Sequence, residues 1–183
     1  MRDTGLDSAP AAPGLNSAPA AQGLGADLAL RPVRDGDSAA LIALIGGCWS
    51  EYPGCVLDVD GEEPWLRAPA TAYAPDDREL WVVERDGAVV ACIGLVAHGE
   101  RAELKSLYVA RAGRRQGLGG RLVAAVEAEA ARRGATAMRL WSDTRFADAH
   151  RLYERYGYRR TGRERDLQDL SDTTEYEFAK MLR

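Results

Sequence analysis

Residues 114–121 read Arg114-Arg115-Gln116-Gly117-Leu118-Gly119-Gly120-Arg121, between an apolar strand pattern that ends at Val109 and a helical pattern that starts near Leu118. Glycine has no side chain to keep an oxyanion away from the backbone, and the first N–H groups of a helix have no partner within that helix. A loop of this kind at a helix N-terminus favours phosphate, and the flanking arginines supply matching charge. The stretch therefore predicts a phosphate-binding loop.

Two common glycine motifs do not fit this loop. A P-loop needs Lys and then Ser or Thr after its last glycine, but Gly120 is followed by Arg121 and Leu122. The dinucleotide fingerprint would need its third glycine at the position of Leu122. What remains is Arg114-x-x-Gly117-x-Gly119, with a plain strand-to-helix turn as the alternative at this point.

The bulk composition is that of a soluble globular protein. The 183 residues are 46% apolar and 28% charged, and the formal net charge of -4 argues against a general nucleic-acid partner. Three cysteines without pairwise metal spacing and only two histidines predict no metal site. No segment reaches the roughly 20 apolar residues of a membrane span, and no signal-peptide pattern is visible. We expect a cytoplasmic protein without a membrane partner.

The first part of the chain changes in character along its length. Residues 1–25 are mostly Ala, Pro, Gly and Ser and predict a disordered leader, so that one domain would cover 26–183. A short strand is expected over 27–32. Asp35-Gly36-Asp37 offers an N-cap for an apolar helix over residues 38–48.

Residues 49–77 have the weakest pattern, with a short helix expected near 63–70. The segment contains four acidic residues, Asp58, Asp60, Glu62 and Glu63. A calcium loop does not fit, because Gly61 is misplaced and Pro69 stands where the closing Glu should be. Two readings stay open: a solvated acidic loop, or carboxylates that attract a cationic amine substrate.

Three further strands are predicted before the loop. Residues 79–85 and 88–97 are rich in Val, Ile and Leu, and Asp86-Gly87 between them is a strong hairpin signal. In the third, residues 102–109, Leu104 and Leu107 are three apart, which breaks the period of two. A bulge near Lys105-Ser106 would reconcile the two halves and leave backbone groups free for a ligand.

After the loop, apolar residues at four-residue spacing predict an amphipathic helix from Leu118 that ends at Gly134. A buried strand over 137–141, a helix over 146–156 and strands over 158–165 and 173–181 complete the chain. The alternation of strands and helices predicts a mixed α/β fold, with the loop at a helix N-terminus.

Three motifs in this order resemble those of the GNAT family of N-acetyltransferases. They are the loop Arg114-x-x-Gly117-x-Gly119, the strand Glu103–Val109, and Leu152-Tyr153-Glu154-Arg155-Tyr156-Gly157-Tyr158. The resemblance covers roughly residues 28–183. It implies a GNAT fold, α/β with a mixed, mostly antiparallel central sheet of about six to seven strands, a bulged central strand and about four flanking helices. One departure is Phe146, which stands where the family often has Asn.

The resemblance also implies acetyl-CoA as co-substrate and assigns site residues. Pantetheine would bind the backbone of Leu107, Tyr108 and Val109. The pyrophosphate would bind Arg114, Arg115, Gln116, Gly117, Leu118, Gly119 and Gly120. Glu103 matches the general base, directly or through water, although it could equally be an exposed strand carboxylate beside Lys105. Tyr153 matches the tyrosine that protonates the departing thiolate, although it also fits an apolar helix stripe; His98 and His150 match no motif.

The function implied is acetyl-CoA-dependent transfer of an acetyl group to a primary amine of a small molecule. Two alternatives stay open: a protein or peptide acetyltransferase acting on lysine or the N-terminus, and a non-catalytic acyl-CoA-binding module. An open acidic groove at 58–63 would favour peptides, whereas a pocket capped by Trp49, Tyr52 and Trp65 would favour small molecules. We expect a monomer or homodimer.

Overall fold

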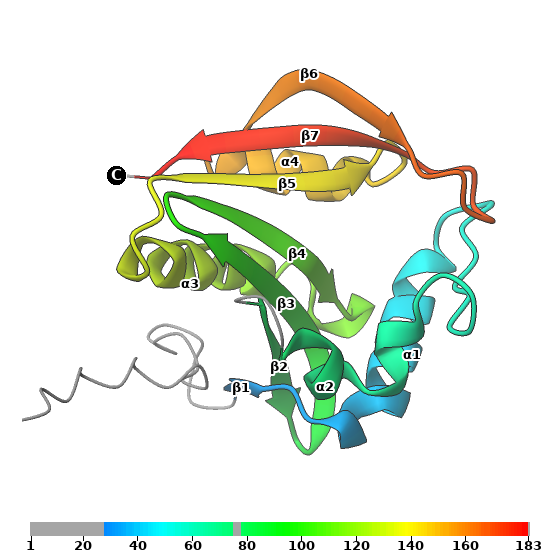
Figure 1. The fold of residues 1–183 in the computed structure, drawn as a ribbon. Helices are drawn as coiled ribbons and strands as arrows, with labels where there is room; N and C mark the ends of the chain where they lie inside the picture. The colour runs from blue at the N-terminus through cyan, green and yellow to red at the C-terminus, as the bar shows by residue number, and fades with distance from the viewer. Residues whose placement is uncertain (1–27, 75–77, 183) are drawn as a thin grey trace, which may run out of the picture.

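The computed structural model describes residues 28–74 and 78–182. They form a seven-stranded sheet in the order β1-β2-β3-β4-β5-β7-β6, in which only β4 and β5 are parallel (Figure 1). The strands are β1 (Ala29–Pro32), β2 (Arg78–Arg85), β3 (Ala88–His98), β4 (Arg101–Val109), β5 (Ala137–Asp143), β6 (Arg159–Asp166) and β7 (Thr174–Met181). The helices are α1 (Ser38–Trp49), α2 (Pro69–Tyr73), α3 (Leu118–Arg132) and α4 (Ala147–Arg155). The expected fold class is confirmed; the predicted leader over 1–25 lies outside the described residues.

Helices cover both faces of the sheet. The predicted stripe of α3, including Leu118, Leu122 and Val126, is fully buried and packs with α4 on one face. On the other face α1 and the segment after it bury Leu41 and Ile45 against β2 and β3. Burial of side chains of this size stabilises the fold by about 1.5–3 kcal/mol each. These two clusters fix the sheet between its helices.

The predicted bulge lies in β4. Cys92 of β3 pairs with Tyr108 and Gly94 pairs with Lys105, so β4 carries one residue more than β3 between these pairs. Ser106 has a positive φ of 50°, which lets the chain accommodate the extra residue. The bulge explains why the apolar period of β4 changes along the strand.

Strands β4 and β5 separate soon after they pair. Their ladder consists of Arg101 with Ala137, Ala102 with Met138 and Glu103 with Arg139. Beyond Glu103 the two strands diverge (Figure 1). The edge of β4 from 104 to 109 is therefore not paired with β5.

The structure differs from the sequence predictions at two places, the N-terminus of α1 and the helix expected near 63–70. Asp37 stands at the N-cap of α1, but its carboxylate does not cap the first turn. It accepts the N–H of Arg34 at 2.7 Å and the Arg31 guanidinium at 2.8 Å, an ion pair that the sequence pattern does not reveal. The helix expected near 63–70 is divided into a 3₁₀ turn, Pro64–Arg67, and α2, because a proline begins each piece.

Gly120 gives a stability prediction. A Cβ at this position would overlap the Tyr156 hydroxyl and lie 2.7 Å from its ring carbon Cε2. We expect Gly120→Ala to lower the free energy of unfolding by about 1–3 kcal/mol, the usual cost of overpacking. The measurement is urea unfolding.

The matched control is Gly47→Ala in α1, where a Cβ meets nothing within 4 Å. Because alanine favours a helix interior over glycine, this variant should gain about 0.5–1 kcal/mol. Equal stability changes of the same sign in the two variants would contradict the packing account.

Candidate active site

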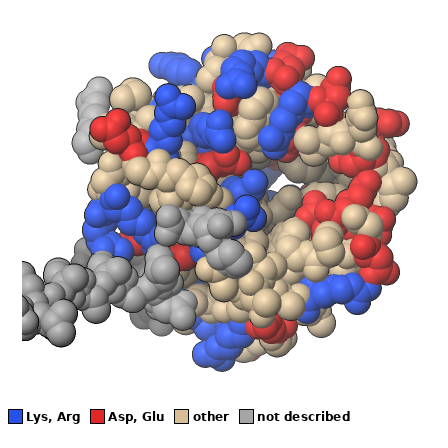
Figure 2. Space-filling model, in the orientation of Figure 1, with Lys and Arg blue, Asp and Glu red and all other residues tan. Residues whose placement is uncertain are grey.

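A cavity of about 740 Å³ lies where β4 and β5 diverge. Its walls come from β4, the loop before α3, α4, the segment after α1, and the connection between β6 and β7. Figure 2 shows the surface hollowed here, with acidic side chains gathered on the right-hand side of the hollow. All the predicted site residues except Gln116 line it: Glu103, Leu107, Tyr108, Val109, Arg114, Arg115, Gly117, Leu118, Gly119, Gly120 and Tyr153.

The glycine loop presents free backbone donors. Within the described part of the chain, none of the N–H groups of residues 115–120 donates to a protein acceptor, and the first bond of the helix runs from Arg121 N to Gly117 O at 3.1 Å. Gly117 has a φ of 77° and stands at the N-cap of α3. Free N–H groups together with the positive end of the helix dipole make a site for an anion such as phosphate.

The arginines of the loop have unequal roles. Arg114 donates from Nε to Val109 O at 2.8 Å, from Nη1 to Glu51 at 2.7 Å and from Nη2 to Cys48 Sγ at 3.3 Å. It therefore ties the end of β4 to α1 as well as lining the cavity. Arg115 is exposed beside the free N–H groups. Gln116 turns its side chain to Ala112 O, 3.0 Å away, which explains its absence from the cavity wall.

Tyr153 is both a core residue and a cavity residue. It is 5% exposed, and its ring packs between those of Tyr158 and Phe178, with centroids 6.0 and 5.9 Å away. Burial raises the pKa of Tyr153 above its ordinary value, so the phenol stays protonated at neutral pH. No group of residues 28–74 or 78–182 hydrogen-bonds its hydroxyl. The hydroxyl can therefore donate to a ligand.

Glu103 is held by two cations. Arg139 of β5 bonds its Oε2 from Nε at 3.0 Å and from Nη2 at 2.9 Å, and Lys105 lies 3.3 Å from its Oε1. The sequence reading anticipated Lys105 but missed Arg139, which comes opposite Glu103 through the parallel register of β4 and β5. An incoming ammonium group would have to compete with both partners for this carboxylate.

The four acidic residues of the segment 58–63 have different surroundings and do not form one charged surface on the cavity. Asp58 accepts the N–H groups of Asp60 and Gly61 at 3.0 Å, which shapes a turn, and Asp60 pairs with Arg67. Glu63 alone of the four lines the cavity, where it accepts the indole N–H of Trp65. Among the described residues, no group of three or more His, Cys, Asp or Glu could hold a metal ion.

Hydrogen bonds close one side of the cavity. We call them the loop bridge: Val56 N donates to Ser171 Oγ at 2.8 Å, Ser171 Oγ donates to Val56 O at 3.3 Å, and Leu170 N donates to Glu62 at 2.7 Å. They join the segment after α1 to the β6–β7 connection. The sequence pattern missed this bridge because both segments lack periodicity.

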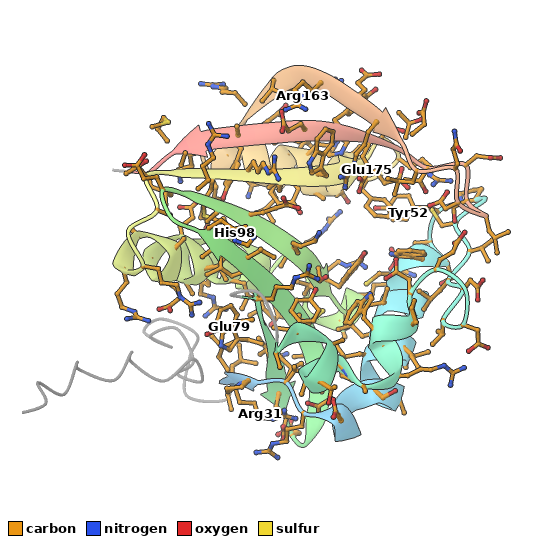
Figure 3. All side chains as sticks on the ribbon, in the orientation of Figure 1. Arg31, Tyr52, Glu79, His98, Arg163 and Glu175 are labelled. Atoms are coloured by element: carbon orange, nitrogen blue, oxygen red, sulfur yellow. The ribbon has the colours of Figure 1, made fainter. Side chains whose placement is uncertain are left out.

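Aromatic side chains line the enclosed side. Trp49 Nε1 donates to the Tyr108 hydroxyl at 3.1 Å, and the rings of Trp65 and Tyr73 meet edge to face with centroids 5.4 Å apart. Tyr52 and Glu175, which line the cavity, lie at its edge in Figure 3. In the same view His98, Glu79 and Arg31 lie away from it.

The histidines take no part in the cavity wall. His98 is exposed at the end of β3, and His150 Nε2 lies 2.9 Å from Asp143 O. Burial lowers the pKa of His150, so its ring is neutral near pH 7.

In the described ranges, no helix is both long and apolar enough to cross a membrane.

Comparisons with known proteins agree with this geometry. The model of a family described as acetyltransferase (GNAT) family matches residues 43–158. An acetyltransferase of Agrobacterium fabrum is 36% identical over 115 residues, which cover 58% of this chain and 82% of the relative.

Two solved structures share the fold. One, described as an acetyltransferase of Salmonella typhimurium with its cofactor acetyl-CoA, has a TM-score of 0.63 and 18% identity, covering 86% of this chain and 95% of its own. Another from Salmonella typhimurium, described as modifying the N-terminal serine of a ribosomal protein, has a TM-score of 0.69 and 10% identity over 87% of this chain and 98% of its own.

Proposed function

The chain belongs to the GNAT family of acetyltransferases, and on that premise we propose that it transfers the acetyl group of acetyl-CoA to a primary amine of a small molecule. The pyrophosphate oxygens would accept hydrogen bonds from the free N–H groups of residues 115–120, and the Arg115 side chain would add positive charge beside them. The amide-rich pantetheine arm would lie along the free edge of β4 at Leu107, Tyr108 and Val109, as an added strand does. Arg114 supports this edge by holding the carbonyl of Val109.

Tyr153 is the proposed acid for the leaving thiolate. Attack of a neutral amine on a thioester forms an oxyanion and then expels a thiolate, which needs a proton. A phenol that stays neutral, and whose hydroxyl has no hydrogen-bond partner among the described residues, can supply it. Backbone N–H groups near the bulge would stabilise the oxyanion. The role of Glu103 as general base stays a prediction from the family resemblance.

The loop bridge is the observation that carries the choice of a small acceptor. It joins Val56 and Glu62 to residues 170–171 and so bounds the cavity on this side, which supports a small acceptor over a lysine within a folded chain. Trp49, Tyr52 and Trp65 line the cavity, and this supports the small-molecule alternative.

A second candidate is acetylation of a chain end. An enclosed cavity can still admit an extended N-terminus, and the structural neighbour described as modifying the N-terminal serine of a ribosomal protein supports keeping this alternative. A non-catalytic acyl-CoA-binding module would need no tyrosine donor. The free hydroxyl of Tyr153 therefore argues against it.

We further propose that the protein acts in the cytoplasm as a monomer or homodimer, with neither nucleic-acid nor membrane partners. Cys48, Cys55 and Cys92 are free thiols, which supports a reducing compartment. Light scattering of the purified protein gives the oligomeric state.

The test of the function is thiol release from acetyl-CoA over a panel of amines, amino acids, aminoglycosides, N-terminal peptides and lysine peptides. We expect turnover with at least one small amine and none with internal lysine peptides. Turnover confined to N-terminal peptides would support the second candidate. Acetyl-CoA binding by calorimetry without turnover on any acceptor would support the module.

A further inference from the structure

We propose that Glu63 is the residue that receives the ammonium group of the acceptor and removes its proton. This inference rests on the proposed function and deepens it, because it assigns the acceptor end of the cavity. It makes Glu63 a catalytic residue and leaves Glu103 a positioning role in the ion-paired wall formed with Arg139 and Lys105.

Glu63 is connected to the bulge through side-chain contacts. The Trp65 indole donates to Glu63 Oε2, and the ring of Trp65 meets that of Tyr73 at 5.4 Å. The Tyr73 hydroxyl lies 2.9 Å from Ser106 Oγ, in the bulge of β4. Glu63, Trp65, Tyr73 and Ser106 all line the cavity. The carboxylate thus shares a wall with the backbone that would hold the thioester.

The indole fixes one oxygen of Glu63 and leaves the other unoccupied. Within the described residues Oε1 has no hydrogen-bond partner, and no Lys or Arg forms an ion pair with this carboxylate. Glu103, by contrast, has two cationic partners. A carboxylate without a cation partner in a cavity attracts an ammonium group more strongly than one already paired.

The charged groups around Glu63 also suit a proton acceptor. Burial is the largest effect and raises its pKa; Glu62 of the same segment and Asp169 of the β6–β7 connection raise it further, and Lys105 of β4 lowers it. The net pKa is above the ordinary value. A base with a raised pKa is closer to the working pH and takes up a proton more readily.

The proposed step balances. The acceptor R–NH₃⁺ gives one proton to the Glu63 carboxylate, and the neutral amine then forms the C–N bond by attack on the thioester carbonyl. The C–S bond breaks when the resulting oxyanion re-forms the carbonyl. The sulfur gains a proton from Tyr153, and the tyrosine regains one from the nitrogen as the amide forms. The proton on Glu63 leaves to solvent, so the products are the N-acetyl amine, the free thiol and one proton.

The test compares Glu63→Gln with the wild type on an amine found in the acceptor screen. Glutamine keeps the size and can still accept the Trp65 bond, but it cannot take up a proton. We expect kcat/KM to fall by about 10²-fold, the lower range for loss of a general base. Because the wild-type base must be ionised, wild-type kcat/KM should fall as the pH drops through the raised pKa of Glu63, and this limb should be lost in the variant.

A second readout separates the chemical role from a structural one. The defect should shrink for an amine that is already neutral at the assay pH, since a lysine-like ammonium has a pKa of about 10.4 and needs a base. Affinity for acetyl-CoA by calorimetry should not change. Asp60→Asn is the matched control, because Asp60 lies in the same segment, pairs with Arg67 and does not line the cavity.

The outcomes are distinct. Equal kcat/KM for Glu63→Gln and the wild type, with a large loss in Glu103→Gln, would overturn the assignment to Glu63 and leave the proposed function intact. An equal loss for neutral and protonated amines would also overturn it, in favour of a structural role. Absence of wild-type turnover on every amine would overturn the proposed function and this inference with it.

Discussion

Replacing Tyr153 with phenylalanine is expected to lower kcat by about 10³-fold, within the range for loss of a general acid. The variant removes only the hydroxyl, and the ring keeps its contacts with Tyr158 and Phe178. Without the phenol, the thiolate must leave unprotonated or wait for water in an enclosed cavity. The measurement is steady-state thiol release on the best acceptor, with acetyl-CoA affinity determined by calorimetry and expected to remain as in the wild type.

Tyr158→Phe is the matched control. Tyr158 is fully buried beside Tyr153, but its hydroxyl contacts Met138 Sδ at 3.7 Å and it does not line the cavity. It should keep the wild-type kcat. A Tyr153→Phe enzyme with wild-type kcat would refute the role of acid, and cofactor binding without turnover in the wild type would favour the non-catalytic module.

Replacing Gly117 with valine is expected to weaken acetyl-CoA binding by about 10²-fold, which corresponds to about 2.7 kcal/mol. Gly117 has a φ of 77°, where a β-branched residue is strained by about 1–3 kcal/mol. A change of this φ would turn the free N–H groups away from the anion. The new side chain would also project into the cavity, because Gly117 lines it. Calorimetry with acetyl-CoA measures the effect.

Gly134→Val provides the comparison at the other end of α3. Gly134 has a φ of 90°, and at both glycines a Cβ would meet nothing within 4 Å. The two variants should therefore lose similar stability in urea unfolding. Only Gly117→Val should lose affinity for acetyl-CoA, and an equal loss in both would mean that general strain, not the loop, controls binding.

Local patterns were sufficient to predict the backbone geometry of the part of the site that we propose binds the co-substrate. The glycine loop, the bulge at Lys105-Ser106 and the helix end with Tyr153 each depend on residues close together in sequence, whose spacing determines backbone geometry. The hairpin at Asp86-Gly87 was predictable for the same reason, and both residues have the positive φ that its turn requires.

The side of the cavity that we propose receives the acceptor could not be predicted from local patterns, because it is formed by contacts between residues distant in sequence. Arg139 reaches Glu103 only through the strand register, and the loop bridge joins residues more than a hundred positions apart. Neither loop segment has a hydrophobic period, so its conformation comes from tertiary hydrogen bonds. The double role of Arg114, which links β4 to Glu51 and Cys48, was hidden for the same reason.

The short ladder between β4 and β5 has a mechanical consequence. Three residue pairs join the strands near Ala102, and across the cavity from this end the loop bridge makes a further connection. The ladder can serve as a pivot, and the bridge then limits how far the two halves of the sheet can swing apart. The side chains of Glu62 and Ser171, which form the bridge, would then set the aperture. Among related chains, variation at these two positions would then tune the width of the acceptor that the cavity tolerates.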